Sequence, residues 1–218
     1  MDKIDNIFSF FGPSMLFIIL IITMYYIYNI MNNPRIFFLD IDDTLLSANN
    51  IFIYFKENLS DNNFIKLTPN EYKKYAMKYP KYHFDFCDFD NPIIISESII
   101  ESTPILHNLE IVKEHIKNGW DLGILTARGE EDTIRKIIPL WLKKQLKIDF
   151  NLKEENIHAV GDRIKIYFGK NDSDKKLNVL IKYWKTSQYK RIKLIDDNES
   201  TINLIKSFEK FKFEYIHC

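Results

Sequence analysis

Five short segments of the chain have the hydrophobic patterns of β-strands. The first two are apolar runs, typical of strands buried on both faces, and the last alternates apolar and polar residues. They lie at residues 35–40, 122–126, 157–160, 191–195 and 211–217. Helix-like stretches separate them, so the pattern predicts an α/β fold with a mostly parallel sheet.

Helix-end signals predict where the connecting helices begin and stop. Thr68-Pro69-Asn70-Glu71 is a capping box with proline at the first helical position, so a helix should run to about Tyr79. A second helix should open at Thr103-Pro104 and end at Asn118-Gly119. Further helices are expected at residues 130–147 and 200–210, and a helix capped by Ser173 or Asp174 should run to about Lys185. The aromatic and acidic residues 80–91 are expected to form a loop or a short strand.

The N-terminal part of the chain has an apolar segment at residues 8–31, and no charged residue occurs between Asp5 and Arg35. Its length exceeds the roughly 20 residues that span a hydrocarbon core of about 30 Å. A signal peptide would have a shorter apolar core and a small-residue cleavage site. A helix packed on the globular domain would show a polar stripe, which this segment lacks. We therefore expect a single-pass transmembrane helix at 8–31, which anchors the domain at 35–218 to a membrane.

The expected side of the membrane is the cytoplasmic one. A glycosylation sequon, Asn198-Glu-Ser200, follows the acidic pair Asp196-Asp197, where an attached sugar would block the site argued for below.

The overall charge limits the class of partner. The chain has 30 Lys and Arg against 30 Asp and Glu, so no global positive field attracts it to nucleic acid, and no extended nucleic-acid surface is expected. Its two cysteines exclude a disulfide scaffold and a cysteine-rich zinc site.

Acidic and hydroxyl side chains follow three of the predicted strands. The first strand ends in Asp40-Ile41-Asp42-Asp43-Thr44, the second in Thr126-Ala127-Arg128, and the fourth in Asp196-Asp197. The carboxyl ends of parallel strands meet at one edge of a sheet, where ligands bind. Carboxylates gathered there repel one another unless a cation joins them. An all-oxygen site favours Mg²⁺.

These residue types suggest roles in phosphoryl transfer. Asp40 can attack phosphorus, and Asp42, two residues on, can act as acid and base. Thr126 can bind a phosphoryl oxygen, and Lys176 can neutralise the charge that nucleophile and phosphate share. The candidate metal ligands are Asp40, Asp42 and Asp197.

With these residues, the chain resembles the haloacid dehalogenase superfamily of phosphatases over about residues 35–210. The first motif, DxDxT, stands at Asp40–Thr44, the second at Thr126, the third at Lys176 and the fourth at Asp196-Asp197. The resemblance is to small phage-type members and polynucleotide 3′-phosphatases. A DxDxT domain behind a membrane anchor is also similar to phosphoprotein phosphatases that act on polymerase tails.

The resemblance implies an aspartyl-phosphate mechanism, with Asp40 as nucleophile, Asp42 as acid/base, and Mg²⁺ on Asp40, the Ile41 carbonyl and Asp197. With the strand pattern, it gives a Rossmann-like three-layer domain with the five strands in the order 5-4-1-2-3. Residues 46–102 stand where the family inserts a cap, which selects the substrate. Three further residues are candidates for supporting the site or binding phosphate: Thr44, Arg128 and Asp196.

Two positions depart from the family pattern or leave a choice open. Thr201 stands where the fourth motif usually adds Asp or Asn, and Lys175, beside Lys176, could be the motif lysine instead.

The sequence as a whole predicts a membrane-anchored, Mg²⁺-dependent phosphatase acting on a phosphorylated substrate of open class. The alternative is a non-catalytic module of the same fold that tethers a partner to the membrane. A receiver-like phospho-switch fits less well, because its paired acids and its phosphoacceptor lie on different strands.

Overall fold

The computed structural model describes residues 13–60 and 63–218, and the chain divides into two compact units, Met1–Pro34 and Arg35–Cys218. In the first unit, Pro13–Asn32 forms helix α2. Residues 8–12 of the predicted transmembrane segment lie outside the described residues.

No helix in the described part of the chain is both long enough and apolar enough to cross a membrane. The predicted membrane anchor, and with it the predicted single-pass localisation with a cytoplasmic domain, is therefore wrong. The second half of α2 has polar groups within its apolar run, on the exposed side chains of Tyr25 and Tyr28.

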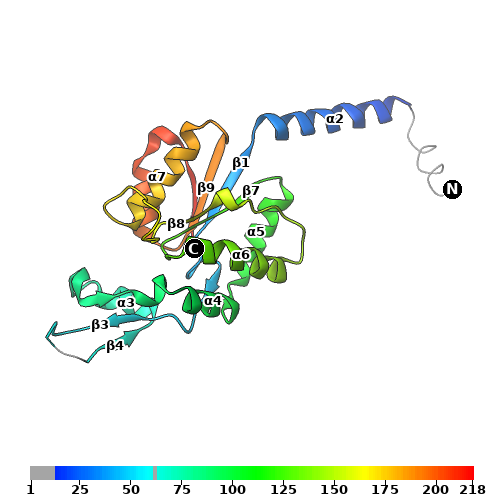
Figure 1. Cartoon of the computed structure of the whole chain (residues 1–218). Coiled ribbons are helices and arrows are strands. Elements are labelled where there is room, and N and C mark those ends of the chain that lie inside the picture. Colours follow the sequence, from blue (N-terminus) through cyan, green and yellow to red (C-terminus); the bar gives the residue numbers. More distant parts are fainter. Residues whose placement is uncertain (1–12, 61–62) are drawn as a thin grey trace. The chain divides into compact units, whose positions relative to one another are not determined.

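A five-stranded parallel sheet forms the centre of the second unit (Figure 1), which confirms the predicted α/β class and mostly parallel sheet. Its strands are β1 (Arg35–Leu39), β7 (Asp121–Thr126), β8 (Ile157–Ala159), β9 (Arg191–Asp196) and β10 (Glu214–His217). The order across the sheet is β10-β9-β1-β7-β8. The strand numbers differ from those of the predicted order, 5-4-1-2-3. Five short strands that the prediction did not include, β2 to β6, lie between β1 and β7 in the chain.

Helices cover both faces of the sheet, and successive side chains of each strand point to opposite faces. In β1, Phe37 and Leu39 pack into a core with helices α5 (Leu106–Lys117) and α6 (Glu131–Leu146). Ile36 and Phe38 pack on the opposite side against α7 (Asp172–Lys185) and α8 (Glu199–Ser207). The domain therefore has the three layers of a Rossmann-like fold (Figure 1).

Several helix ends differ from the sequence-based prediction. Thr103–Pro104 is strand β6, paired antiparallel with β2 (Leu46–Ser47), so α5 begins only at Leu106. Helix α7 begins with Asn171 as its cap, whose side chain accepts a hydrogen bond from the Asp174 N–H at 2.9 Å. Short 3₁₀ helices complete the described elements: η1 (Lys81–His83), η2 (Cys87–Asp90), η3 (Glu154–Asn156) and η4 (Glu209–Phe211).

Residues 46–102, called the insertion below, lie beyond the end of β1 (Figure 1). They include a small antiparallel sheet, β4-β3-β5, and two helices. The bounds are β3 (Ile53–Phe55), β4 (Ile65–Leu67), β5 (Phe84–Asp85), α3 (Pro69–Tyr75) and α4 (Pro92–Ile100). The predicted capping box at Thr68 and Glu71 is present, although α3 ends at Tyr75. The core is aromatic, with the Phe55 ring 4.9 Å from Tyr75 and 4.7 Å from Tyr79.

A main-chain contact joins the insertion to the loop after β7. The Gly129 N–H donates to the Phe89 carbonyl at 2.8 Å. A β-carbon at position 129 would lie only 3.0 Å from that oxygen and would clash with the Asp90 carboxylate. Glycine is therefore required for this close approach.

Candidate active site

Three carboxylates meet where β1 and β9 end. Asp40, Asp196 and Asp197 each offer an oxygen, and these oxygens all lie within 4.8 Å of one another. The cause is the parallel pairing that sets Leu39 opposite Ile195, so that the next residues of both strands are neighbours. The Asp40 N–H donates to the Ile195 carbonyl at 3.0 Å and fixes this register at the strand end.

Lys176, from α7, lies between two of these carboxylates. Its buried Nζ is 3.1 Å from Asp40 Oδ1 and 2.8 Å from Asp196 Oδ2. Burial alone would lower the pKa of Lys176, but the charges of Asp196 and Asp40 outweigh burial and raise it above its ordinary value. Lys176 therefore carries a positive charge inside the site.

Burial has the opposite effect on the pKa of Asp40. Burial raises the pKa of Asp40 to about 8; Lys176 opposes this rise, and Asp196, Asp42 and Asp197 add to it. One lysine does not offset the combined effect of burial and the neighbouring carboxylates on the pKa of Asp40. A further cation would favour the ionised form of Asp40.

The donor set fits a hard metal ion. Asp196 already uses both oxygens, since Oδ2 pairs with Lys176 and Oδ1 accepts from the Asn198 N–H at 2.8 Å. Asp40 and Asp197 remain as the carboxylates best able to hold a cation, and the Asp197 side chain is 14% exposed. Carboxylate oxygens are ligands of Mg²⁺ and Ca²⁺ alike, so the residues could hold a divalent ion of this kind.

Asp42 is held by Arg128 rather than grouped with the other three acids. Arg128 Nε donates to Asp42 Oδ2 at 2.8 Å, and Nη2 donates to Oδ1 at 2.6 Å. A third donor, Nη1, reaches Ser98 Oγ of α4 at 2.7 Å. Arg128 thus fixes the direction of the Asp42 carboxylate and ties it to the insertion.

The remaining predicted residues have separate places. Thr126 is buried at the end of β7, where its Oγ1 accepts from the Arg128 N–H at 3.3 Å. Thr44 Oγ1 accepts from the Asp197 N–H at 3.1 Å and so supports the loop after β9. Lys175 Nζ donates to the Val160 carbonyl at 3.1 Å, whereas Lys176 reaches the carboxylates.

Lys73, from α3 of the insertion, also reaches the acidic group, which the sequence pattern does not predict. Its Nζ lies 2.9 Å from Asp197 Oδ2 and 3.1 Å from Asp43 Oδ2. Asp43 has a left-handed backbone, with φ of 55°, in the turn after β1. No local pattern indicates a contact between residues 124 positions apart, so sequence reasoning had no signal for it.

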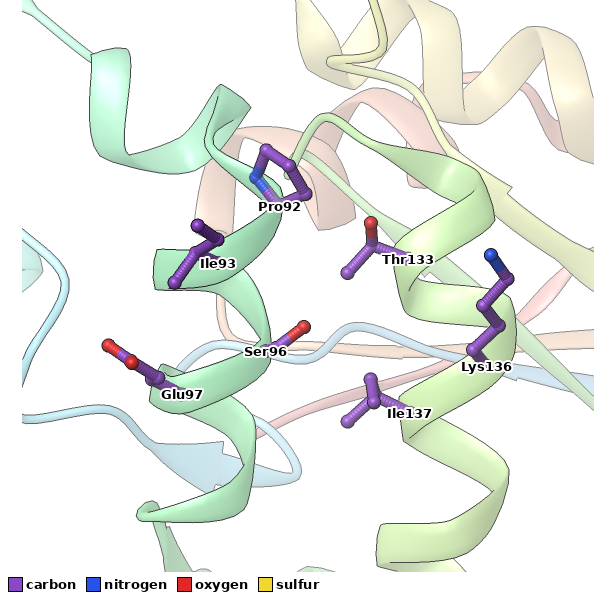
Figure 2. A pocket seen from close by; sticks show the side chains of 7 residues that line it. All are labelled: Pro92, Ile93, Ser96, Glu97, Thr133, Lys136 and Ile137. Carbon is purple, nitrogen blue, oxygen red and sulfur yellow. The ribbon is translucent and has the colours of Figure 1, made fainter.

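Two cavities lie apart from these acids. One, of about 430 Å³, is a groove between α4 and α6 (Figure 2), and it is lined by Pro92, Ile93, Ser96, Glu97, Thr133, Lys136 and Ile137. The other, of about 570 Å³, lies within the insertion; its lining includes Tyr54, Lys56, Phe64, Tyr82 and Phe84. Neither lining includes a residue of the acidic group.

Comparison with known proteins gives limited similarity. No family model matches the chain, and no curated protein sequence matches it. A chain in the structure of the Pnkp1/Rnl/Hen1 complex is 14% identical with a TM-score of 0.46, and the match covers 86% of this chain and 46% of that one. A chain in the structure of the Pnkp1/Rnl/Hen1 RNA repair complex is 13% identical with a TM-score of 0.47, over 86% and 43%. The present chain thus spans less than half the length of either chain that it resembles.

Proposed function

We propose that this protein is a metal-dependent phosphatase that hydrolyses a phosphomonoester through a covalent phosphate on Asp40. The observation that carries the proposal is the buried Asp40 carboxylate, 3.1 Å from Lys176 and grouped with Asp196 and Asp197. A buried nucleophile beside a fixed positive charge suits attack on an anionic phosphate. The order of the four motifs, which resembles that of haloacid dehalogenase phosphatases, supports the same conclusion.

In the first step, an oxygen of Asp40 attacks phosphorus, and the bond from phosphorus to the leaving oxygen breaks. Asp42 donates a proton to that oxygen, which leaves as an alcohol. Lys176 offsets negative charge shared by Asp40 and the phosphoryl group, and the Thr126 hydroxyl donates to a phosphoryl oxygen. Arg128 occupies only part of the hydrogen-bonding capacity of Asp42, because each carboxylate oxygen can accept more than one bond.

In the second step, a water molecule attacks the phosphoryl group. Asp42 accepts a proton from this water, the bond between phosphorus and Asp40 breaks, and inorganic phosphate leaves. Asp40 returns as a carboxylate, and Asp42 is protonated for the next turnover. The net reaction is phosphoester plus water to alcohol plus phosphate.

The proposed metal is Mg²⁺, which Asp40 and Asp197 would hold. The Ile41 carbonyl, the third ligand expected from the sequence, already accepts hydrogen bonds from the Leu45 and Leu46 N–H groups at 2.9 and 3.1 Å. When bound, Mg²⁺ supplies positive charge that offsets the phosphoryl oxygens. Lys176 and Asp196 stabilise the position of Asp40 from the buried side.

The proposed domain spans residues 35–218, with the insertion as a cap that selects the substrate. The exposed Asp85 on the insertion would repel a long polyanion lying along it, whereas Asp88 is buried and Asp90 is paired with Arg163. The proposed substrate is a small phosphoester or the phosphorylated end of a chain.

The test is hydrolysis of p-nitrophenyl phosphate by the purified full chain, with MgCl₂ or with EDTA. We expect turnover with MgCl₂, little with EDTA, and a loss of at least about 10³-fold in Asp40→Asn. Asp149→Asn, an exposed acid outside the site, is the matched control. Equal turnover in Asp40→Asn and the control would refute the assignment. A wild-type protein with no turnover on any phosphoester class would favour the non-catalytic alternative.

A further inference from the structure

Lys73 links the insertion directly to the acidic group. Its side chain is 53% exposed, and its Nζ contacts Asp197 and Asp43 across the mouth of the site. The neighbouring residue, Lys74, is also exposed but has no ion pair within 4.0 Å among the described residues. The contact is therefore specific to position 73 of α3.

Asp197 is also one of the two carboxylates best able to hold the metal ion. The ammonium of Lys73 lies 2.9 Å from Asp197 Oδ2, close to where a cation bound by that carboxylate would lie. Two positive charges at one carboxylate repel each other. A doubly charged ion attracts that carboxylate more strongly than an ammonium does.

We propose that Lys73 is a positioning residue that competes with the metal ion for Asp197, so that metal binding releases α3 from the mouth of the site. The inference rests on the metal site of the proposed function. Its consequence is an order of binding: the cation binds first, and the released helix then gives the phosphoester access to Asp40.

Other contacts limit the movement. Tyr72 and Tyr75 of α3 pack against Phe84 and Phe55, so α3 would move together with the small sheet of the insertion. The far end of the insertion remains held by the Gly129–Phe89 hydrogen bond and by the ion pair of Arg163 with Asp90. Neither contact involves a metal-binding carboxylate. Release of Lys73 therefore frees the α3 side of the insertion without detaching the whole of it.

The first test is titration of the full chain with MgCl₂ by calorimetry. Lys73→Met keeps the apolar stem and removes the charge, and Lys74→Met on the same helix is the matched control. We expect Lys73→Met to bind Mg²⁺ at least about fivefold more tightly than the wild type, and Lys74→Met to stay within about twofold. Affinity in Lys73→Met equal to that of the control, or weaker, would overturn the competition.

The second test is amide hydrogen exchange in α3, which a purely structural role of Lys73 would not couple to the metal. We expect exchange in the wild type to rise several-fold on addition of MgCl₂. In Lys73→Met it should be fast without the metal and unchanged by it. Tighter binding with no change in exchange would overturn the release of α3. A wild type that binds no Mg²⁺ would refute the metal site itself and the competition with it.

Discussion

Arg128 donates two hydrogen bonds to Asp42, although the two residues are 86 positions apart in the chain. The arginine is fully buried, and its third donor reaches Ser98 of the insertion. One guanidinium therefore joins the end of β1, the loop after β7 and α4. The planar arrangement of its donors allows all three bonds at once, which an ammonium group does not.

We predict that Arg128→Lys lowers the free energy of unfolding by about 3 kcal/mol, because it leaves buried partners of the arginine without their hydrogen bonds. Urea unfolding monitored by circular dichroism measures the change. Arg191→Lys is the control: Arg191 pairs with Glu214 at the surface, so its loss should cost less than about 1 kcal/mol. Equal losses in both variants would contradict a structural role for the Arg128 contacts.

We also predict that acid destabilises the protein through His158. Burial lowers the pKa of His158 to about 4, against an ordinary value of 6.5. Between these values the unfolded chain binds the proton and the folded protein does not, so stability is full above pH 6.5 and falls as the pH drops towards 4. The loss should reach about 3 kcal/mol and should be smaller in His158→Gln. Chemical unfolding at several pH values measures it, and His107→Gln, at an exposed position, should retain the wild-type slope.

In EDTA, Asp40 should destabilise the protein as the pH rises, whereas His158 does so as the pH falls. The pKa of Asp40 is raised from 3.8 to about 8, so the folded state retains a proton that the unfolded chain has lost. Stability from this group is therefore present below pH 3.8 and is lost as the pH rises towards 8. We predict that Asp40→Asn is more stable than the wild type at pH 8, on the order of a few kcal/mol, with a smaller difference at pH 5. A stability gap that does not change with pH would exclude this explanation.

Addition of MgCl₂ provides the companion measurement. Because the ion favours the ionised carboxylate, it should raise the melting temperature of the wild type more than that of Asp40→Asn. Equal shifts in the two proteins would place the bound ion elsewhere.

The central sheet could be predicted because it is buried on both faces. In β1, Ile36, Phe37, Phe38 and Leu39 are all fully buried, so four consecutive residues are apolar and the run is unmistakable in sequence. The acids at the strand ends could be placed at one edge for the same reason, since parallel strands bring their carboxyl ends together.

The insertion could not be predicted in the same way. Its strands are two or three residues long, too short for a periodic pattern. Its core combines residues of these strands with aromatic rings from α3 and the loops. The sequence pattern does not predict helix α4, and it places Thr103–Pro104 at the start of a helix although the extended backbone there pairs with β2. The contacts of Arg128 with Asp42 and of Lys73 with Asp197 depend on tertiary folding, which local sequence does not encode.

The hydrogen bond from Gly129 to the Phe89 carbonyl has a consequence for protein engineering. Because both partners are main-chain groups, this attachment of the insertion does not depend on the identity of the side chain at position 89. Positions on the outer part of the insertion, such as Phe64 and Tyr82, can therefore be randomised in a library while this attachment is kept. Such a library should leave glycine at position 129 unchanged.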